Sequence, residues 1–360
     1  MVKKKFSYAE AGVDIAKHRE AHAVIGRLIE STFQLRKDKT GRVLTPFGHY
    51  AALIELDEKR ALALHSDGVG SKVLVAQAAE KYDTVGIDCV AMCVNDLICV
   101  GAEPISLVDY LAVQEPNQSL IEEVMKGLVK GAEIADVAIV GGETAILPEV
   151  ISGAVQGRGF DLSATVVGIV DKDKAVTGKD LKPGDAILGL ESSGIHSNGL
   201  TLARKIFFEK AKLGVHDEAP GLKRAVGEEL LEPTKIYVKE IMDIIKSHQV
   251  HALAHITGGT FSKLKRFRDY SKTGFLIDDM PEPQPIFRVI QRLGGVSDEE
   301  MYRTFNMGVG FCVVCPDREA DSILKALRVK FRARVRQIGV TTKETAIRLR
   351  IPSKEELVLG

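Results

Sequence analysis

Apolar residues along this chain fall into two patterns that predict β-strands and amphipathic helices in alternation. In the first half, apolar runs of strand length lie at 51–56, 61–65, 105–113, 137–140 and 162–170. Apolar residues recur with helical spacing at 19–33, 73–79, 84–100 and 119–135. Only the charged residues 57–60 separate the first two strands, a spacing typical of a β-hairpin.

The second half continues this alternation after a polar break. Strands are expected at 186–190, 251–256, 275–277, 310–315, 335–340 and 346–351, and helices at 200–212, 236–245, 286–293 and 320–329. The break consists of the charged residues 171–174 and a Pro-Gly turn at 180–185. Because such segments commonly separate domains, we expect two domains, residues 1–170 and 171–360.

The composition narrows the class of protein. The 360 residues are 45% apolar, which is enough for two domains of ordinary size. Lys plus Arg and Asp plus Glu both number 49, so the formal net charge is zero. The charge balance therefore gives no reason to expect nucleic acid or a membrane surface as a partner. No stretch approaches the roughly eighteen apolar residues of a membrane span, and no apolar run of signal-peptide length follows the basic start. We expect a cytoplasmic protein that binds neither nucleic acid nor a membrane.

The five cysteines indicate reduced thiols, because an odd number in a large chain does not suit a disulfide framework. Cys312 and Cys315 have the CxxC spacing of zinc and redox sites. No second ligand pair accompanies them, and they lie in an apolar run. We therefore expect both thiols to act as small core side chains in a strand.

The most distinctive stretch is the end of the strand at 61–65 and the turn that follows it. This turn contains Asp67, Gly68, Gly70, Ser71 and Lys72. Glycines allow backbone N–H groups to surround phosphate oxygens, and a carboxylate is a hard ligand for Mg²⁺. The P-loop spacing Gly-x4-Gly-Lys-Ser/Thr is not met. The turn therefore predicts a nucleotide site centred on acids and a metal, with Lys72 as a helper on the phosphates.

The helix expected at 84–100 carries polar residues among apolar ones. Asp88 and Asn95 are seven residues apart and so point the same way, and Asp96 lies about 80° further round. A buried carboxylate needs a partner or a metal ion. Metal binding is one interpretation of these residues, and capping with salt bridges is the other.

Further candidate residues follow other predicted strands. Asp109 lies within the strand at 105–113, and the strand at 137–140 leads into a predicted turn with Gly141, Gly142 and Glu143. The loop 191–199 precedes a helix and contains His196, Ser197 and Asn198, a composition that suits anion binding or proton transfer. A capping loop without function is the alternative. The turn formed by Thr257, Gly258 and Gly259 precedes another helical segment.

Eight runs of this sequence, taken in order, resemble the phosphoribosylformylglycinamidine cyclo-ligase family, also called aminoimidazole ribonucleotide synthetases. They lie at 11–15, 67–72, 86–96, 101–104, 141–145, 196–199, 255–259 and 305–310. The resemblance implies an α+β, two-domain ATP-dependent synthetase. In it the N-terminal sheet pairs across a homodimer into a β-barrel, and the C-terminal domain is an α/β sandwich.

The implied reaction converts formylglycinamidine ribonucleotide and ATP into 5-aminoimidazole ribonucleotide, ADP and phosphate, in purine biosynthesis. ATP phosphorylates the formyl oxygen, and a nitrogen of the same molecule then closes the ring. Such chemistry needs Mg²⁺, hydrogen-bond donors that stabilise the negative charge of the transferring phosphoryl group, and an acid or base near the substrate.

The resemblance assigns these needs to three groups of residues. Mg²⁺ is assigned to Asp67, Asp88, Asn95, Asp96 and Glu143. ATP is assigned to Gly68, Gly70, Ser71, Lys72, Asp109, Gly141, Gly142 and Glu143. The substrate is assigned to His196, Ser197, Asn198, Thr257, Gly258 and Gly259, and the catalytic residues are expected to be Asp67, Asp96 and His196.

Other proteins of the same superfamily are the alternatives to a cyclo-ligase. Selenophosphate synthetase would place a reactive cysteine near the N-terminus, whereas Cys89 is the first cysteine here. Thiamine-monophosphate kinase would be rich in paired aspartates, and only Asp278 and Asp279 form such a pair. A hydrogenase-maturation ATPase and a non-catalytic nucleotide-binding protein are the remaining alternatives. This chain also departs from bacterial family members at 42–50, where it keeps only the Phe-Gly of their glycine-rich run. This departure leaves open whether Arg42 or His49 contributes to ATP binding.

Overall fold

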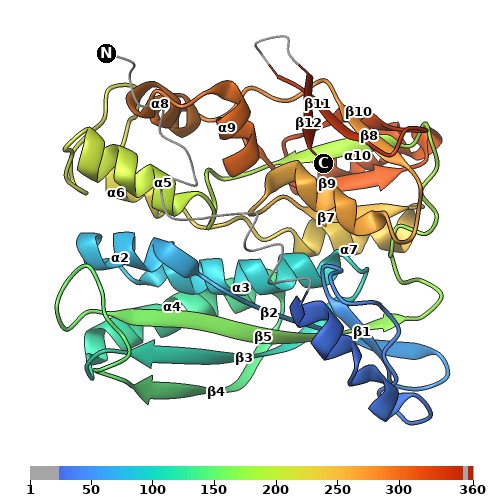
Figure 1. Cartoon of the computed structure of the whole chain (residues 1–360), viewed down its shortest axis with the longest axis horizontal. Helices are drawn as coiled ribbons and strands as arrows, with labels where there is room; N and C mark the ends of the chain where they lie inside the picture. The colour runs from blue at the N-terminus through green and yellow to red at the C-terminus, as the bar shows by residue number, and fades with distance from the viewer. Residues whose placement is uncertain (1–23, 352–355, 360) are drawn as a thin grey trace.

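Two β-sheets, one from each half of the chain, form the framework of the protein (Figure 1). This computed structural model describes residues 24–351 and 356–359. Residues 24–30 are helical, whereas the beginning of the helix expected at 19–33 and the run 11–15 lie outside the described residues. Helices and strands mix in both halves, as the sequence pattern predicts.

The first sheet has five strands in the order β1-β2-β5-β3-β4. Their bounds are β1 Ala52–Glu55, β2 Arg60–Gly68, β3 Glu103–Val113, β4 Ala138–Ile146 and β5 Phe160–Asp171. β1 and β2 pair antiparallel, so the predicted hairpin is confirmed. β3 and β4 pair in parallel, and α4 (Gln118–Ala135) connects them.

Strand β4 continues through the segment where the sequence suggested a glycine turn. Gly142 lies opposite Asp109 in β3, and a Cβ atom at Gly142 would come within 2.3 Å of Asp109 Oδ1. The glycine therefore makes room for a neighbouring carboxyl group inside a strand. Composition alone gave no sign of this because glycine is also the usual residue of turns.

Helix α3 (Asp83–Ile98) lies between the first sheet and the second domain (Figure 1). It packs on β2 and β5, and on its other side it contacts α7 (Val238–Ser247) and β7 (Ala252–His255). Its crossing with α4 is close, because a Cβ atom at Gly127 would lie 1.9 Å from Asp83 O. α2 (Val73–Ala79) precedes α3 and follows the short 3₁₀ turn η2 (Gly70–Lys72).

The outer face of the first sheet carries exposed apolar side chains. Ile105, Val108 and Tyr110 of β3 are 44%, 42% and 41% exposed, and Val140 of the edge strand β4 is 65% exposed. Leu107 and Leu111 of β3 point to the opposite face and are buried. One face of this sheet therefore covers α3, while the other leaves an apolar surface uncovered in the single chain.

The second sheet has seven strands in the order β12-β11-β8-β10-β6-β9-β7. The strands not yet given are β6 Ala186–Glu191, β8 Gly274–Ile277, β9 Val309–Cys315, β10 Val335–Thr342, β11 Ile347–Arg350 and β12 Glu356–Leu359. β9 is buried along its whole length, and Cys312 and Cys315 are inaccessible to solvent within it. This agrees with the expected core role of both thiols.

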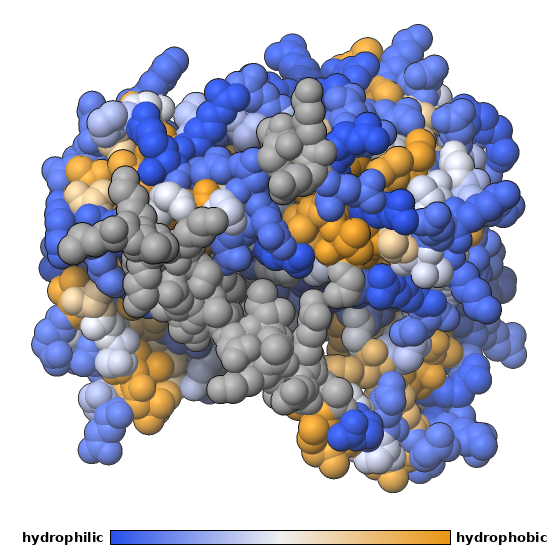
Figure 2. All heavy atoms as spheres, turned by 45° about the horizontal axis from the view of Figure 1, so that its top comes forward, coloured by the Kyte–Doolittle hydropathy of each residue, from blue (hydrophilic) through white to orange (hydrophobic). Residues whose placement is uncertain are grey.

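Helical segments surround the second sheet. They are α5 Leu200–Arg204 with the π-helical continuation η3 Lys205–Lys210, α6 Val226–Leu230, the 3₁₀ segment η4 Thr260–Phe267, α8 Pro285–Gly294, α9 Asp298–Thr304 and α10 Asp317–Phe331. A further 3₁₀ turn, η1 (Phe33–Arg36), precedes β1. On the face shown in Figure 2, hydrophobic side chains form separate patches among hydrophilic ones. No helix among the described residues is both long and apolar enough to span a membrane.

Candidate functional site

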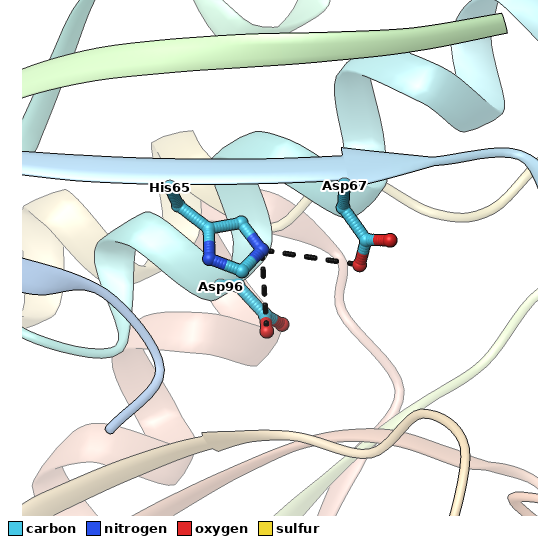
Figure 3. A group of neighbouring side chains, drawn as sticks. All are labelled: His65, Asp67 and Asp96. Atoms are coloured by element: carbon cyan, nitrogen blue, oxygen red, sulfur yellow. Dashed lines mark ion pairs between the residues drawn. The ribbon is translucent and has the colours of Figure 1, made fainter. Parts of the chain in front are cut away.

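Strand β2 and helix α3 bring one histidine and two aspartates together (Figure 3). His65 and Asp67 are two residues apart on β2 and share a face of the sheet, and Asp96 projects from α3. His65 Nε2 lies 3.8 Å from Asp67 Oδ2 and 3.6 Å from Asp96 Oδ2. One ligand atom from each residue lies within 4.8 Å of the others, so this cluster could hold a metal ion.

Hydrogen bonds orient both carboxylates of this cluster. The Gly68 backbone N–H donates to Asp67 Oδ1 at 2.8 Å, and His255 Nδ1 lies 2.7 Å from Asp96 Oδ1. Each aspartate is thus bonded through one oxygen, while the Oδ2 atoms of both face His65. The side chain of Asp96 is only 3% exposed, whereas that of Asp67 is 37% exposed. A ligand could therefore approach from the side of Asp67.

The environment of Asp96 stabilises its ionised form. Burial alone raises the pKa of the Asp96 carboxyl, but the His255 hydrogen bond and the electrostatic effects of His65 and Lys263 outweigh burial and lower the pKa. Asp96 is therefore an anion at neutral pH, as a metal ligand must be.

The second domain contributes positive charge to the same place through η4. Arg266 Nη1 lies 3.8 Å from Asp96 Oδ2, and the guanidinium stacks 4.5 Å from the ring centre of Tyr50. Burial lowers the pKa of Lys263, and Arg266 lowers it further, while Asp96 and Asp67 oppose this shift. The site therefore combines acids from the first domain with basic groups from the second, which suits a metal–phosphate ligand.

Lys72 and Asp88 lie elsewhere in the domain junction and contact each other. Lys72 Nζ is 2.8 Å from Asp88 Oδ2 and also donates to Glu232 O at 2.6 Å. Asp88 Oδ1 accepts hydrogen bonds from the backbone N–H and the hydroxyl of Thr234, at 2.7 and 2.6 Å. Neither charged side chain is accessible to solvent. These contacts join the domains. Because the ammonium group of Lys72 is buried among them, it is not placed to contact a phosphate from solvent.

Asn95 also joins the domains. Its amide donates to Lys235 O at 2.8 Å, and its Oδ1 accepts from the Tyr237 N–H at 3.0 Å. The same amide lies 3.4 Å from His255 Nε2, so Asn95 supports the histidine that orients Asp96. Asn95 thus acts on the cluster through His255 in this structure.

The glycine turn after β2 is partly open. Gly70 has a φ of +68°, and a Cβ atom there would meet nothing within 4 Å, so its backbone borders free space. Ser71 Oγ lies 3.1 Å from Thr201 Oγ1 of α5. The turn is therefore anchored on the second domain while Gly68 and Gly70 remain near the cluster.

Sheet register decides how the remaining residues of the first domain lie. Asp67 and Asp109 both pair with Ala164 of β5, so they share one row of the sheet and are two strands, or about 10 Å, apart. Burial raises the pKa of Asp109.

Glu143 pairs with Tyr110, one residue beyond the row, and is exposed. Because successive side chains alternate in direction, Glu143 lies on the outer face of the sheet, with Tyr110, and away from Asp67. Gly141 is exposed in the same edge strand.

The two predicted substrate loops of the second domain lie against each other. A Cβ atom at Gly258 would come within 2.8 Å of Asn198 Oδ1, and Nδ2 of Asn198 is buried with no hydrogen-bond partner in the described chain. Thr257 is 3% exposed, and Gly259 has a φ of +82°. The Ser197 hydroxyl, in contrast, donates to Asp88 Oδ1 at 3.1 Å. Asn198 thus offers an unused donor beside the Gly258 backbone.

His196 is fully buried and adopts a φ of +59°. Its Nε2 accepts a hydrogen bond from the Ser193 N–H at 3.1 Å, and its ring centre lies 6.5 Å from that of His255. Burial lowers the pKa of His196 well below its ordinary value, and the charges of His255, Lys72 and Lys235 act in the same direction. The neutral imidazole is therefore the stable form.

The loop that departs from bacterial family members contacts the cluster through Arg266, which stacks on Tyr50 and donates to His49 O. Arg42 Nε lies 3.1 Å from Glu55 Oε2, and His49 packs edge-on against Tyr50, Phe267 and Tyr270. Both residues therefore have structural partners in the described chain.

Sequence reasoning did not assign roles to four residues of this site: His65, His255, Lys263 and Arg266. For His65 a signal was present, because it lies two residues before Asp67 in a strand and so must share its face. The other three come from a segment about 160 residues away, and no local pattern connects them with Asp96.

Comparison with known proteins identifies the family. Residues 48–170 match the family "AIR synthase related protein, N-terminal domain", and residues 182–352 match "AIR synthase related protein, C-terminal domain". The phosphoribosylformylglycinamidine cyclo-ligase of Methanothermobacter thermautotrophicus is 51% identical over 322 residues, 89% of this chain and 91% of the relative. This chain belongs to the phosphoribosylformylglycinamidine cyclo-ligase family.

Other members of the cyclo-ligase family are similarly close. That of Methanocaldococcus jannaschii is 50% identical over 89% of this chain and 87% of the relative. That of Methanosarcina barkeri is 47% identical over 96% of this chain and the whole relative. The predicted family, the enzyme class and the purine-biosynthetic cyclo-ligase function are confirmed.

Solved structures support the fold of this cyclo-ligase family member. "Crystal Structure of Hydrogenase Maturation Protein HypE" has a TM-score of 0.61 at 19% identity, covering 86% of this chain and 91% of that one. "AaThiL complexed with AMPPCP and TMP" has a TM-score of 0.61 at 17% identity, covering 89% and 92%. The predicted two-domain mixed fold of this superfamily is confirmed.

Proposed function

We propose that this chain closes the imidazole ring of formylglycinamidine ribonucleotide with ATP, yielding 5-aminoimidazole ribonucleotide, ADP and phosphate. The observation that carries the proposal is 51% identity over 89% of the chain to a cyclo-ligase. The site described above supports it, because oriented acids face basic groups where the two domains meet. We place this reaction in the cytoplasm.

Mg²⁺–ATP is proposed to bind at Asp67 and Asp96. The fit rests on two carboxylates that each leave one oxygen directed into the same space. A bound divalent ion would neutralise charge on the nucleotide phosphates. Gly68 and Gly70 are proposed to approach the phosphates through their backbone, and Gly70 borders the free space that this requires.

Lys263 and Arg266 are proposed to stabilise the phosphoryl group during its transfer to the formyl oxygen. Both groups lie beside the acids, and Arg266 is fixed by its contact with Tyr50. Positive charge held in place before the reaction stabilises a developing anion without reorganisation. Asp109 lies in the same sheet row as Asp67 and is proposed to border the nucleotide.

The substrate is proposed to bind between the loops of Asn198 and Gly258. The unpaired Asn198 amide and the adjacent glycine backbone offer N–H donors to a ribose phosphate. The neutral His196 holds the shape of its loop through the Ser193 N–H. Lys72, Asp88, Asn95 and Ser197 are proposed to support the site by joining the domains.

A homodimer is proposed to cover the outer face of the first sheet. Ile105, Val108, Tyr110 and Val140 expose apolar surface there, and β4 has an unpaired edge. Pairing of two such sheets would remove this edge and bury the apolar side chains. Glu143 would then lie at the interface between subunits.

The test is a reaction with defined substrates. Purified protein, ATP, Mg²⁺ and formylglycinamidine ribonucleotide should release one phosphate for each aminoimidazole formed. Phosphate release is followed by a coupled assay, and the aminoimidazole is followed by its colour reaction after diazotisation. Phosphate release that does not depend on the substrate would contradict the proposal.

A further inference from the structure

The imidazole of His65 has a nitrogen atom that the described residues leave without a hydrogen bond. Nε2 of His65 is buried and makes no hydrogen bond within the described chain. It points at two carboxylate oxygens, but the separations of 3.6 and 3.8 Å are too long for hydrogen bonds. Figure 3 shows the imidazole directed between the two aspartates.

The two carboxylates are arranged as metal ligands usually are. Asp67 Oδ1 is held by the Gly68 N–H and Asp96 Oδ1 by His255, which leaves Oδ2 of each directed towards His65, with that of Asp96 also 3.8 Å from Arg266 Nη1. Outer hydrogen bonds of this kind orient ligands around a metal ion. Bonds of about 2.1 Å place neighbouring ligands about 3.0 Å apart in octahedral and about 3.4 Å apart in tetrahedral geometry. The His65–Asp67 and His65–Asp96 separations exceed the tetrahedral value by about 0.2–0.4 Å and the octahedral value by about 0.6–0.8 Å, so binding requires a side-chain movement of this size.

We propose that His65 is a metal ligand, and that His65, Asp67 and Asp96 together bind a first-row transition metal dication such as Mn²⁺ more tightly than Mg²⁺. Mg²⁺ prefers oxygen ligands and retains water, whereas imidazole nitrogen favours transition metals. The inference rests on the proposed nucleotide site and specifies its ion. Sequence reasoning considered only oxygen ligands there.

A guanidinium group of the second domain lies next to the cluster. Arg266 is held at 3.8 Å from Asp96 Oδ2 by its stacking on Tyr50 and by a hydrogen bond to His49 O. It is therefore fixed beside the carboxylate oxygen of Asp96 that faces His65.

The experiment uses the full chain, freed of metal with a chelator and without nucleotide. MnCl₂ is titrated, and the free Mn²⁺ is measured by electron paramagnetic resonance. Electron spin echo modulation of the bound Mn²⁺ then reports a directly coordinated ¹⁴N. We expect one Mn²⁺ per chain with nitrogen coupling, and at least about tenfold weaker binding of Mg²⁺ in competition.

Matched variants isolate His65. His65→Asn should remove the nitrogen coupling and weaken Mn²⁺ binding by at least about tenfold, while leaving the weaker Mg²⁺ binding nearly unchanged. His216→Asn changes an exposed histidine and should bind Mn²⁺ as the wild type does. Bound Mn²⁺ without nitrogen coupling in the wild type, or unchanged Mn²⁺ affinity in His65→Asn, would overturn the proposal.

The wild-type nitrogen coupling needs no variant, so the proposal stays testable even if His65→Asn does not fold. The failure of the metal proposal and that of the proposed function are also distinguishable. Ring closure supported by Mg²⁺ with no Mn²⁺ preference would remove the metal proposal alone. Nitrogen-coupled Mn²⁺ without ring closure would remove the proposed reaction alone.

Discussion

Lys72 Nζ lies 2.8 Å from Asp88 Oδ2, and both side chains are completely removed from solvent. Around them, Glu232 O and Thr234 of the second domain supply further hydrogen bonds. The pair therefore lies in the contact between the two domains, and both charges depend on each other for compensation.

Removing one member of this pair should destabilise the protein. We expect Lys72→Met to lower the free energy of unfolding by about 3–5 kcal/mol, because Asp88 would remain charged and buried without its partner. Urea denaturation followed by circular dichroism measures this. Lys126→Met is the matched control, since its pair with Glu122 is exposed, and it should cost no more than about 1 kcal/mol. A stable Lys72→Met protein that no longer binds ATP would instead support a phosphate contact.

Asp67→Asn should affect the reaction far more than the fold. The carboxylate is partly exposed, so the change should alter the free energy of unfolding by only about 0.5 kcal/mol. We expect the rate of ring closure to fall at least about 100-fold, because an anion facing the proposed metal site is lost. Steady-state kinetics at saturating ATP measures this. Asp321→Asn, on the exposed surface of α10, should leave the rate unchanged. Near-normal turnover of Asp67→Asn would remove Asp67 from the site.

His49 should make the stability of the protein depend on pH. Burial lowers the pKa of His49 to about 4, although Thr177 O opposes the shift. An unfolded histidine has a pKa near 6.5, so between these values the unfolded chain binds the extra proton. Stability should therefore fall as the pH decreases from about 6.5 to 4, by up to about 3 kcal/mol from this group.

Urea denaturation at pH 7 and pH 5 tests this contribution of His49. The difference between the two free energies of unfolding should shrink in His49→Phe, which keeps an aromatic ring against Phe267 and Tyr270. His216→Phe should retain the wild-type difference, because this residue is exposed. An identical pH dependence in His49→Phe and wild type would contradict the expectation.

The proposed dimer can be broken without disturbing the monomer. Val108 lies on the outer face of β3 and is 42% exposed in the single chain, so Val108→Glu should fold but place a charge in the proposed interface. We expect the variant to be a monomer by size-exclusion chromatography with light scattering, and the wild type a dimer. Val329→Glu is the control, since Val329 is 74% exposed on α10. A monomeric wild type would contradict the proposed assembly.

The sequence predicted the elements well where local periodicity is strong. The hairpin of β1 and β2, the long helices α3 and α4, and the buried strand β9 are all present. Asp67 and Asp96 were both assigned to the predicted metal site, together with Asp88, Asn95 and Glu143. The structure brings Asp67 and Asp96 within one small cluster.

What the sequence did not reveal depends on contacts across long separations. Lys72 was expected on phosphates, yet its partners include Glu232 O, 160 residues away. Glu143 was expected with the metal, but strand register turns it to the outer face beside Tyr110. Strand direction and domain docking set both positions, and neither is encoded in a local run of residues. The positions of Lys72 and Glu143 therefore follow from the three-dimensional arrangement and not from the local sequence pattern.

Helix α3 has a consequence for how this protein can be divided. The two family domains are separate stretches of sequence, but Asp88 and Asn95 of the first complete their hydrogen bonds with Thr234, Lys235 and Tyr237 of the second. The first half expressed alone would therefore expose polar groups that are designed for a dry contact. A chimaera that joins one half to a relative's other half would need to exchange residues 232–237 together with α3. The two halves of this protein thus depend on each other for the hydrogen bonds of α3.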